Sequence, residues 1–137
     1  MSVEGNVQVL KEAYAAFNRG DIPAILGRLS EKVEWIAPNV EPVAGTYHGR
    51  DGAAQFFRKV KEIVEFSAFE PREYVAQGDR VIALGNYKGT AHATGKSYGC
   101  DWVMSFTFRD GKVTKFQEFT DTAAIAAALT ATSAATA

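Results

Sequence analysis

Hydrophobic residues recur every three or four positions between Val3 and Asn18, which predicts an amphipathic helix with one buried stripe. Gly20 suits the left-handed position after this helix. Asp21 can cap a second, short helix that carries Pro23 in its first turn. A third helix is predicted to begin at Asp51. The packed side of this third helix is expected to hold Phe56, Phe57, Val60, Ile63 and Val64.

Elsewhere the hydrophobic period shortens to two residues, which is typical of strands. "SEKVEWIAP" predicts a short strand that ends at Pro38, and residues 39–49 are expected to form a loop. From Phe66 onward the sequence predicts four strands joined by tight turns, the last of them "RDG". One face of the third of these strands is expected to carry Trp102, Met104, Phe106 and Phe108.

This order of elements predicts an α+β fold, in which helices pack against one face of an antiparallel sheet. Glycines within the long strands favour a strongly curved sheet. A curved sheet under helices encloses a pocket if the helices leave its mouth unfilled. "TAAIAAAL" predicts a final short helix, and residues 130–137 are expected to be a disordered tail. We therefore predict a single domain over residues 1–129.

The composition argues against several classes of partner. The 137 residues carry 15 basic and 16 acidic side chains, with no dense basic cluster, so neither nucleic acid nor a membrane is expected to bind. The single cysteine, Cys100, excludes an internal disulfide, and the two histidines lie far apart, so no metal is expected. No secretory signal or membrane-spanning stretch is recognisable. We expect a cytoplasmic protein without a cofactor.

Four segments carry a resemblance to a known family: "EAYAAFNRGD", "VEWIAP", "GTYHGRDGAAQFF" and "FTFRDGKVTKFQEFTDTAAI". They resemble the nuclear transport factor 2-like superfamily, and within it the SnoaL-like branch, which includes polyketide cyclases and ketosteroid isomerase-related proteins. The resemblance implies a cystatin-like cone, with a curved antiparallel sheet wrapped around three N-terminal helices. It also implies a homodimer formed by the outer face of the sheet. The fold hosts isomerases, cyclases, hydrolases and binding proteins, so it does not fix the activity.

The last strand carries the candidate catalytic group. Phe116, Glu118 and Thr120 share one of its faces, and in cyclase and epoxide-hydrolase relatives an acid at the place of Glu118 points into the cone. Burial would raise the pKa of such a carboxyl toward neutrality, which suits general acid–base catalysis. The alternative is a surface glutamate paired with a lysine. Asp121 is a second candidate, although it can instead cap the last helix. Tyr14 is a third, as a pocket donor or a structural hydrogen-bonding group.

The remaining candidates are residues expected to contact a ligand. The walls of the pocket are expected to include Trp35, Trp102, Met104, Phe56 and Phe116. Tyr47 and His48 lie in the loop expected at the rim. Asn86 could contribute a polar contact if its strand aims it inward. The dimer face is expected to include Val103, Gln117 and Phe119.

Two hypotheses about function remain open at this point. In the first, the pocket binds a small hydrophobic molecule and Glu118 acts as the acid or base of a cofactor-independent isomerase, cyclase or hydrolase. In the second, the protein is a non-catalytic ligand-binding or dimeric interaction module. True ketosteroid isomerase activity is disfavoured, because Ala37 and Met104 lie where those enzymes carry acids.

Overall fold

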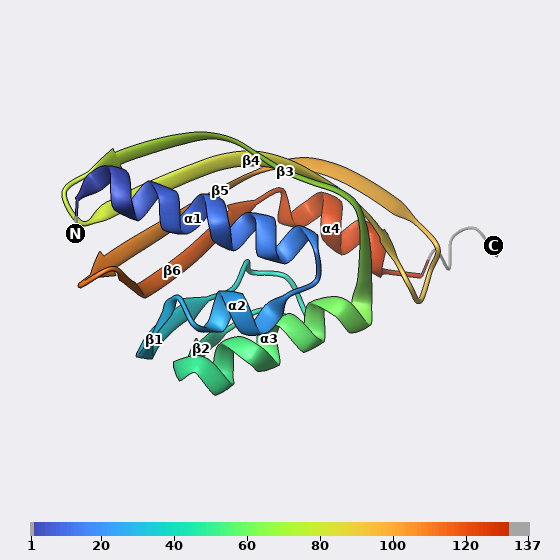
Figure 1. The fold of residues 1–137 in the computed structure, drawn as a ribbon. Coiled ribbons are helices and arrows are strands. Elements are labelled where there is room, and N and C mark those ends of the chain that lie inside the picture. Colours follow the sequence, from blue (N-terminus) through green and yellow to red (C-terminus); the bar gives the residue numbers. More distant parts are fainter. Residues whose placement is uncertain (1, 132–137) are drawn as a thin grey trace.

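The computed structural model describes residues 2–131, with helices and strands in the order that the sequence predicts plus one additional strand (Figure 1). The elements are α1 (Val3–Asn18), α2 (Ile22–Leu26), β1 (Leu29–Ile36), β2 (Thr46–His48), α3 (Gly49–Ile63), β3 (Val64–Gln77), β4 (Arg80–Ala91), β5 (Ser97–Arg109), β6 (Lys112–Thr120) and α4 (Thr122–Leu129). The predicted α+β class is confirmed. Of the tail predicted at residues 130–137, the part from residue 132 lies outside the described residues.

All the strands belong to one six-stranded sheet with the order β2-β1-β6-β5-β4-β3. Neighbouring strands pair antiparallel except β1 and β6, which run parallel with Trp35 opposite Phe116. The predicted antiparallel sheet is therefore antiparallel at every pair but this one. The parallel pairing arises because the chain crosses from β1 to the far side of the sheet and returns beside β1 only with its last strand.

The helices cover the concave side of the sheet (Figure 1). α1 packs against β3 and β4, α3 against β1 and β2, and α4 against β5 and β4. α2 bridges α1 and α3. Asp21 caps α2 by accepting a hydrogen bond from the backbone of Ala24, as the sequence predicted. The concave face of the sheet thus meets helices from both ends of the chain.

Several boundaries differ from the prediction by a few residues: α3 begins at Gly49 rather than Asp51, and β1 ends at Ile36 rather than Pro38. Two further differences change the type of element. Residues 46–48 form β2 rather than loop, because Tyr47 pairs with Trp35 of β1. A three-residue strand depends on its partner, so its own sequence carries little signal. Val64 begins β3 rather than ending α3, and its side chain is buried there. The apolar run across residues 63–64 fits either element, which explains the error.

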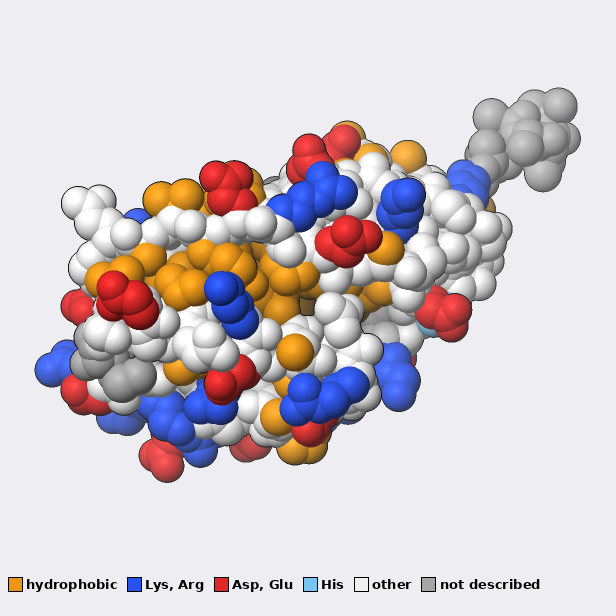
Figure 2. Space-filling model, turned by 45° about the horizontal axis from the view of Figure 1, so that its top comes forward, with side chains coloured by type: hydrophobic (Ala, Val, Ile, Leu, Met, Phe, Trp, Pro, Cys, Tyr) orange, Lys and Arg blue, Asp and Glu red, His pale blue; other side chains and the backbone are white. Residues whose placement is uncertain are grey.

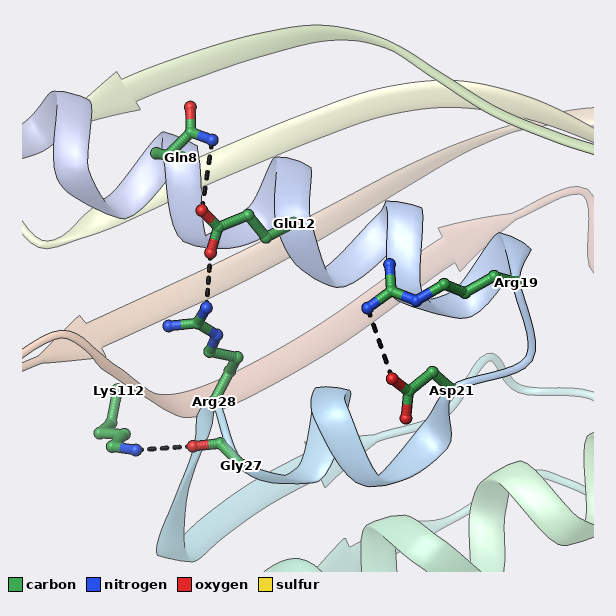
Figure 3. A network of polar contacts seen from close by, with 7 residues as sticks. All are labelled: Gln8, Glu12, Arg19, Asp21, Gly27, Arg28 and Lys112. Carbon is green, nitrogen blue, oxygen red and sulfur yellow. Dashed lines mark hydrogen bonds and ion pairs between the residues drawn. The ribbon is translucent and has the colours of Figure 1, made fainter.

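Exposed polar contacts tie α1 to the corner between α2 and β1 (Figure 3). Glu12 of α1 accepts hydrogen bonds from Gln8 and Arg28, and the ion pair with Arg28 joins the two segments. Lys112 at the start of β6 donates to the backbone oxygen of Gly27 at 2.6 Å. Such solvent-exposed pairs contribute up to about 1 kcal/mol each, so they orient the corner more than they stabilise the fold.

A close contact between β4 and β5 positions the base of the core. Trp102 of β5 lies against the backbone of Gly85, its pairing partner on β4, and its ring stacks on Tyr14 with 5.5 Å between centroids. A Cβ at residue 85 would lie 2.3 Å from Trp102 Cζ2 and 2.4 Å from the backbone oxygen of Glu70. Glycine is therefore required here, because no other residue leaves room for the indole ring.

Replacing Gly85 by alanine is expected to lower the free energy of unfolding by about 1–3 kcal/mol, the usual cost of overpacking a core. The matched control is Gly99→Ala on the next strand, where the nearest atom to a new Cβ is Lys88 Cγ at 3.5 Å. That change should alter stability by less than about 0.5 kcal/mol. Urea unfolding of both variants measures the difference. Equal stabilities would contradict the described contact.

Candidate functional site

A cavity of about 110 Å³ lies between the concave face of the sheet and the helices. Its lining is apolar except for the hydroxyls of Tyr14, Tyr87 and Tyr98, the indole N–H of Trp35 and the carboxyl of Glu118. The principal apolar groups of the lining are Leu10, Phe17, Trp35, Phe56, Phe57, Phe66, Phe69, Met104, Phe106, Phe116 and Ile125. Figure 2 shows hydrophobic side chains around a hollow on the face turned forward, with charged side chains around them. An apolar cavity of this kind disfavours water and suits an apolar molecule.

Aromatic contacts fix the shape of one wall. The rings of Trp35 and Phe116 stack with their centroids 3.8 Å apart, which follows from the parallel pairing of β1 and β6. Phe56 and Phe57 of α3 contact the other side of this cluster, with ring centroids 5.8 and 5.4 Å from that of Trp35. Such tilted and stacked rings give a rigid surface that suits a flat ligand.

Glu118 is the one charged residue in this lining, and its side chain is set by its place on β6. It pairs with Met104 of β5, and both side chains point to the concave side. The residue is 8% exposed. Tyr87 donates a hydrogen bond from its hydroxyl to Glu118 Oε2 at 2.8 Å. Within residues 2–131, Oε1 has no hydrogen-bonding partner, and the side chain that carries it lines the cavity.

Burial controls the charge of Glu118. Loss of water around the carboxylate raises the pKa of Glu118 from 4.5 to about 7, and the hydrogen bond from Tyr87 opposes this rise. The same burial raises the pKa of the Tyr87 hydroxyl, so that this group stays protonated and donates. A carboxyl with a pKa near neutrality exchanges a proton readily at physiological pH, which is the property of a general acid or base.

Most of the candidates expected on the walls lie in the cavity lining, namely Tyr14, Trp35, Phe56, Met104 and Phe116. The hydroxyl of Tyr14 donates to Met104 Sδ at 3.1 Å. Burial and the nearby Tyr74 and Glu118 raise the pKa of Tyr14, so the hydroxyl stays neutral. Its hydrogen bond to sulfur gives it the structural role that the sequence left open.

Asp121, Trp102 and Asn86 lie outside the cavity lining. Trp102 was expected to line it and Asn86 to do so if its strand aimed it inward, whereas capping of the last helix was the alternative given for Asp121. Asp121 is exposed and accepts a hydrogen bond from the backbone of Ala124, so it caps α4. Trp102 is fully buried beneath Tyr14, because Gly85 lets its ring pack against the sheet. Asn86 points to the opposite face of β4, where it donates to the backbone oxygen of Cys100 and to Asp101.

Tyr47 and His48 were predicted at the rim, but they line a separate polar hollow beside α3. Tyr47 is buried and donates to the backbone oxygen of Val43 at 2.9 Å, and Lys59 donates to its hydroxyl at 3.2 Å. These bonds anchor the segment before α3 to the helix itself. Tyr47 therefore holds this segment against α3, and neither Tyr47 nor His48 lines the cavity.

Tyr87 is the functional candidate that the sequence interpretation missed. It lies on the inward face of β4 with Val81, Ala83 and Gly85, opposite the face of Asn86. The pairing of Ala83 with Met104 fixes this alternation. The sequence does contain one indication of this face: Val81, Ala83 and Gly85 are small, and small residues leave room for a large side chain, here that of Trp102, to pack across them.

Within residues 2–131, no three His, Cys, Asp or Glu side chains come together in a way that could hold a metal ion. Over the same residues, none of the helices combines the length and the hydrophobicity needed to cross a membrane.

The structure is a cone of sheet and helices around a cavity that contains an acid, which is the form of a small pocket protein. A comparison with known proteins identifies its family. A model of the SnoaL-like domain matches residues 10–116. The chain therefore belongs to the SnoaL-like family of the nuclear transport factor 2-like superfamily. A search of curated proteins gave no match.

Solved structures show the same fold over nearly the whole chain. An NTF2-like protein from Burkholderia xenovorans LB400 is 42% identical, with a TM-score of 0.86, and the match covers 95% of this chain and 99% of that one. An NTF2-like protein from Burkholderia pseudomallei K96243 is 33% identical, with a TM-score of 0.87 and coverage of 96% and 100%. TerC, co-crystallised with polyporic acid, is 31% identical, with a TM-score of 0.81 and coverage of 91% and 98%.

The raised pKa of Glu118 predicts that stability falls as the pH rises from 4.5 to about 7. In this window the folded protein keeps a proton that the unfolded chain releases, so unfolding becomes more favourable as the pH rises. The full loss is about 3 kcal/mol and is complete above the folded-state pKa. The variant Glu118→Gln cannot lose this proton, so it should lack this component.

Urea unfolding of both proteins at about pH 5 and about pH 8 measures the effect, because other titrating groups cancel in the difference. The wild type should lose stability relative to Glu118→Gln at the higher pH. An identical pH dependence of the two proteins would show that Glu118 titrates as an ordinary surface carboxyl.

Proposed function

We propose that this protein binds a small, flat hydrophobic molecule in its cavity and that Glu118 transfers a proton to or from that molecule. The observation that carries the proposal is the position of Glu118, a lone carboxyl in the lining of an aromatic cavity, with Oε1 free of hydrogen bonds within residues 2–131. Membership of the SnoaL-like family supports a ligand-binding or cyclase role at the level of the family.

The dimensions of the cavity limit the part of the ligand that enters. A cavity of about 150 Å³ can hold benzene, and this one has a volume of about 110 Å³. One ring of a ligand is therefore the most that the walls enclose as they stand. A larger molecule must extend toward the hollow seen in Figure 2 or displace side chains of α3. The co-crystallisation of TerC with polyporic acid supports a small-molecule ligand in a related fold.

The chemistry expected of Glu118 is proton abstraction from carbon or oxygen. Its carboxylate is a stronger base than a solvated one, because burial raises its pKa to about 7. Tyr87 holds one oxygen, so only the other is free to contact the ligand. An isomerisation or an intramolecular ring closure needs only such a group and an apolar site that excludes water. Neither reaction needs a cofactor.

The Kemp elimination of 5-nitrobenzisoxazole tests this property without knowledge of the natural substrate. A base removes one proton from the probe, whose ring opens to a coloured phenolate. The wild type should accelerate the reaction, and the rate should rise with pH through the pKa of Glu118 at about 7, because only the carboxylate is a base. Glu118→Gln should reduce the rate at least about a hundredfold, the usual contribution of general base catalysis.

A pair of variants on α1 shows whether the reaction occurs in the cavity. Ala13 lines the cavity, whereas Ala15 on the same helix is exposed. Ala13→Phe should fill the space and abolish the acceleration, and Ala15→Phe should leave it unchanged. If Glu118→Gln or Ala13→Phe retains the wild-type rate, the proposed function is wrong.

A homodimer formed through the outer face of the sheet is a second proposal, and it is compatible with the first. Leu84, Val103 and Phe119 lie side by side across β4, β5 and β6 on that face. Phe119 is 52% exposed. An apolar row at the centre of an open sheet face favours pairing with a second copy.

Phe119→Lys should convert the dimer to a monomer, because it places a charge at the centre of this face on both copies. Thr114→Lys, at a half-buried position farther along β6, is the matched control and should leave the dimer intact. Sedimentation equilibrium of the three proteins gives the molecular mass. A wild type that is monomeric at all concentrations would overturn this proposal.

A further inference from the structure

A chain of hydrogen bonds leads from Glu118 along the sheet to the end of β6. The hydroxyl of Tyr87 lies 2.8 Å from Glu118 Oε2 and 2.8 Å from Thr120 Oγ1. Thr120 Oγ1 in turn lies 3.2 Å from the backbone oxygen of Asp101 and 3.5 Å from Cys100 Sγ. Glu118 is 8% exposed and Thr120 is half-buried, so the chain connects the cavity to the outer end of the strand.

The number of protons in this chain allows two arrangements. Tyr87 has one hydroxyl proton and two oxygen partners at the same distance, so it donates to one and accepts from the other. When Glu118 is ionised, Thr120 donates to Tyr87 and Tyr87 donates to Glu118. When Glu118 is protonated, Glu118 donates to Tyr87, Tyr87 donates to Thr120, and Thr120 donates to the backbone oxygen of Asp101. The two arrangements differ by one proton, so gain or loss of that proton, together with reorientation of the hydroxyl groups, interconverts them without movement of heavier atoms.

We propose that Tyr87 and Thr120 form a relay that carries the proton of Glu118 between the cavity and water at the end of β6. The inference rests on the proposed function, because it supplies the step that restores Glu118 after each proton transfer. It assigns a role to two residues behind the carboxyl, on the side away from the ligand. Both act through Glu118 and are positioning residues.

Each proton transfer along this chain breaks one O–H bond and forms another. The O–H bond of Glu118 breaks and its proton passes to the oxygen of Tyr87, whose own proton passes to Thr120. The hydroxyl of Thr120 turns away from the backbone oxygen of Asp101 and its proton passes to a water molecule at the end of β6, so one proton leaves and no group is oxidised or reduced. The reverse sequence protonates Glu118 from water. The tyrosine never has to exist as a free phenolate, which its raised pKa disfavours, because the transfers are concerted.

The groups around Glu118 favour this route over one through the cavity. Tyr14 from α1, Tyr87 from β4, and Tyr98 and Cys100 from β5 are the titratable groups that face this region, and burial raises the pKa of the three tyrosines, so their hydroxyls stay neutral. No second charged side chain lines the described cavity. An apolar cavity contains little water, and a bound ligand excludes what remains. The hydroxyl chain is therefore the polar path to Glu118.

Infrared spectroscopy after a rapid pH jump tests the relay on the free protein, so it needs no ligand. The carbonyl band of protonated Glu118 is identified by its absence in Glu118→Gln. Thr120→Val removes the outer hydroxyl and should slow the change in this band about tenfold, the factor for the loss of one hydrogen bond from the path. Thr120→Ser keeps the hydroxyl and should restore the wild-type rate.

Tyr87→Phe keeps the ring and removes the inner hydroxyl. It should slow the band change at least as much as Thr120→Val and raise the pKa of Glu118 by about one unit, because it removes the bond that favours the carboxylate. Thr120→Val should leave the pKa of Glu118 near that of the wild type. If Glu118 changes protonation as fast in Thr120→Val as in the wild type, the proposed relay is wrong. That result would leave the Kemp assay, and with it the proposed function, unaffected.

Discussion

The hydrogen bond between the hydroxyl of Tyr87 and the carboxyl of Glu118 is the interaction on which the properties of the cavity depend. Burial alone would keep Glu118 protonated, because an ionised carboxylate is costly in an apolar environment. The bond from Tyr87 partly offsets this cost and brings the pKa to about 7. The bond also fixes one carboxyl oxygen of Glu118 against β4. The other oxygen has no hydrogen bond within residues 2–131 and belongs to a side chain that lines the cavity. The carboxyl is thereby both positioned and able to exchange a proton.

The architecture provides this pair by bringing distant parts of the chain together. Tyr87 and Glu118 lie on β4 and β6, with β5 between them, in a sheet that curves around the helices (Figure 1). Both side chains line the same cavity. Because Gly85 has no side chain, Trp102 can pack against the sheet and stack on Tyr14. The helices add aromatic side chains from α1 and α3 that complete the walls. The cavity is thus bounded by the sheet on one side and by separate helices on the other.

The sequence predicted the fold well and the site in part, for physical reasons that differ between strands. The period of two places Glu118 with Phe116, and the inward direction of that face came from the family resemblance. On β4, both faces carry apolar residues, and the inward one is small because Trp102 covers it, so periodicity could not separate Asn86 from Tyr87. Register shifts in β3 bring both Phe66 and Phe69 to the cavity, which strict alternation does not allow. Asp121 is adjacent in sequence to the site but faces solvent, because it caps α4.

Diffraction from crystals under xenon pressure tests the central claim most directly, because xenon binds in apolar cavities irrespective of the natural ligand. The account predicts a xenon atom between Phe116, Met104 and the helices, with the carboxyl of Glu118 at the wall and bonded to Tyr87. A filled interior without xenon, or a Glu118 side chain directed into bulk solvent, would contradict it.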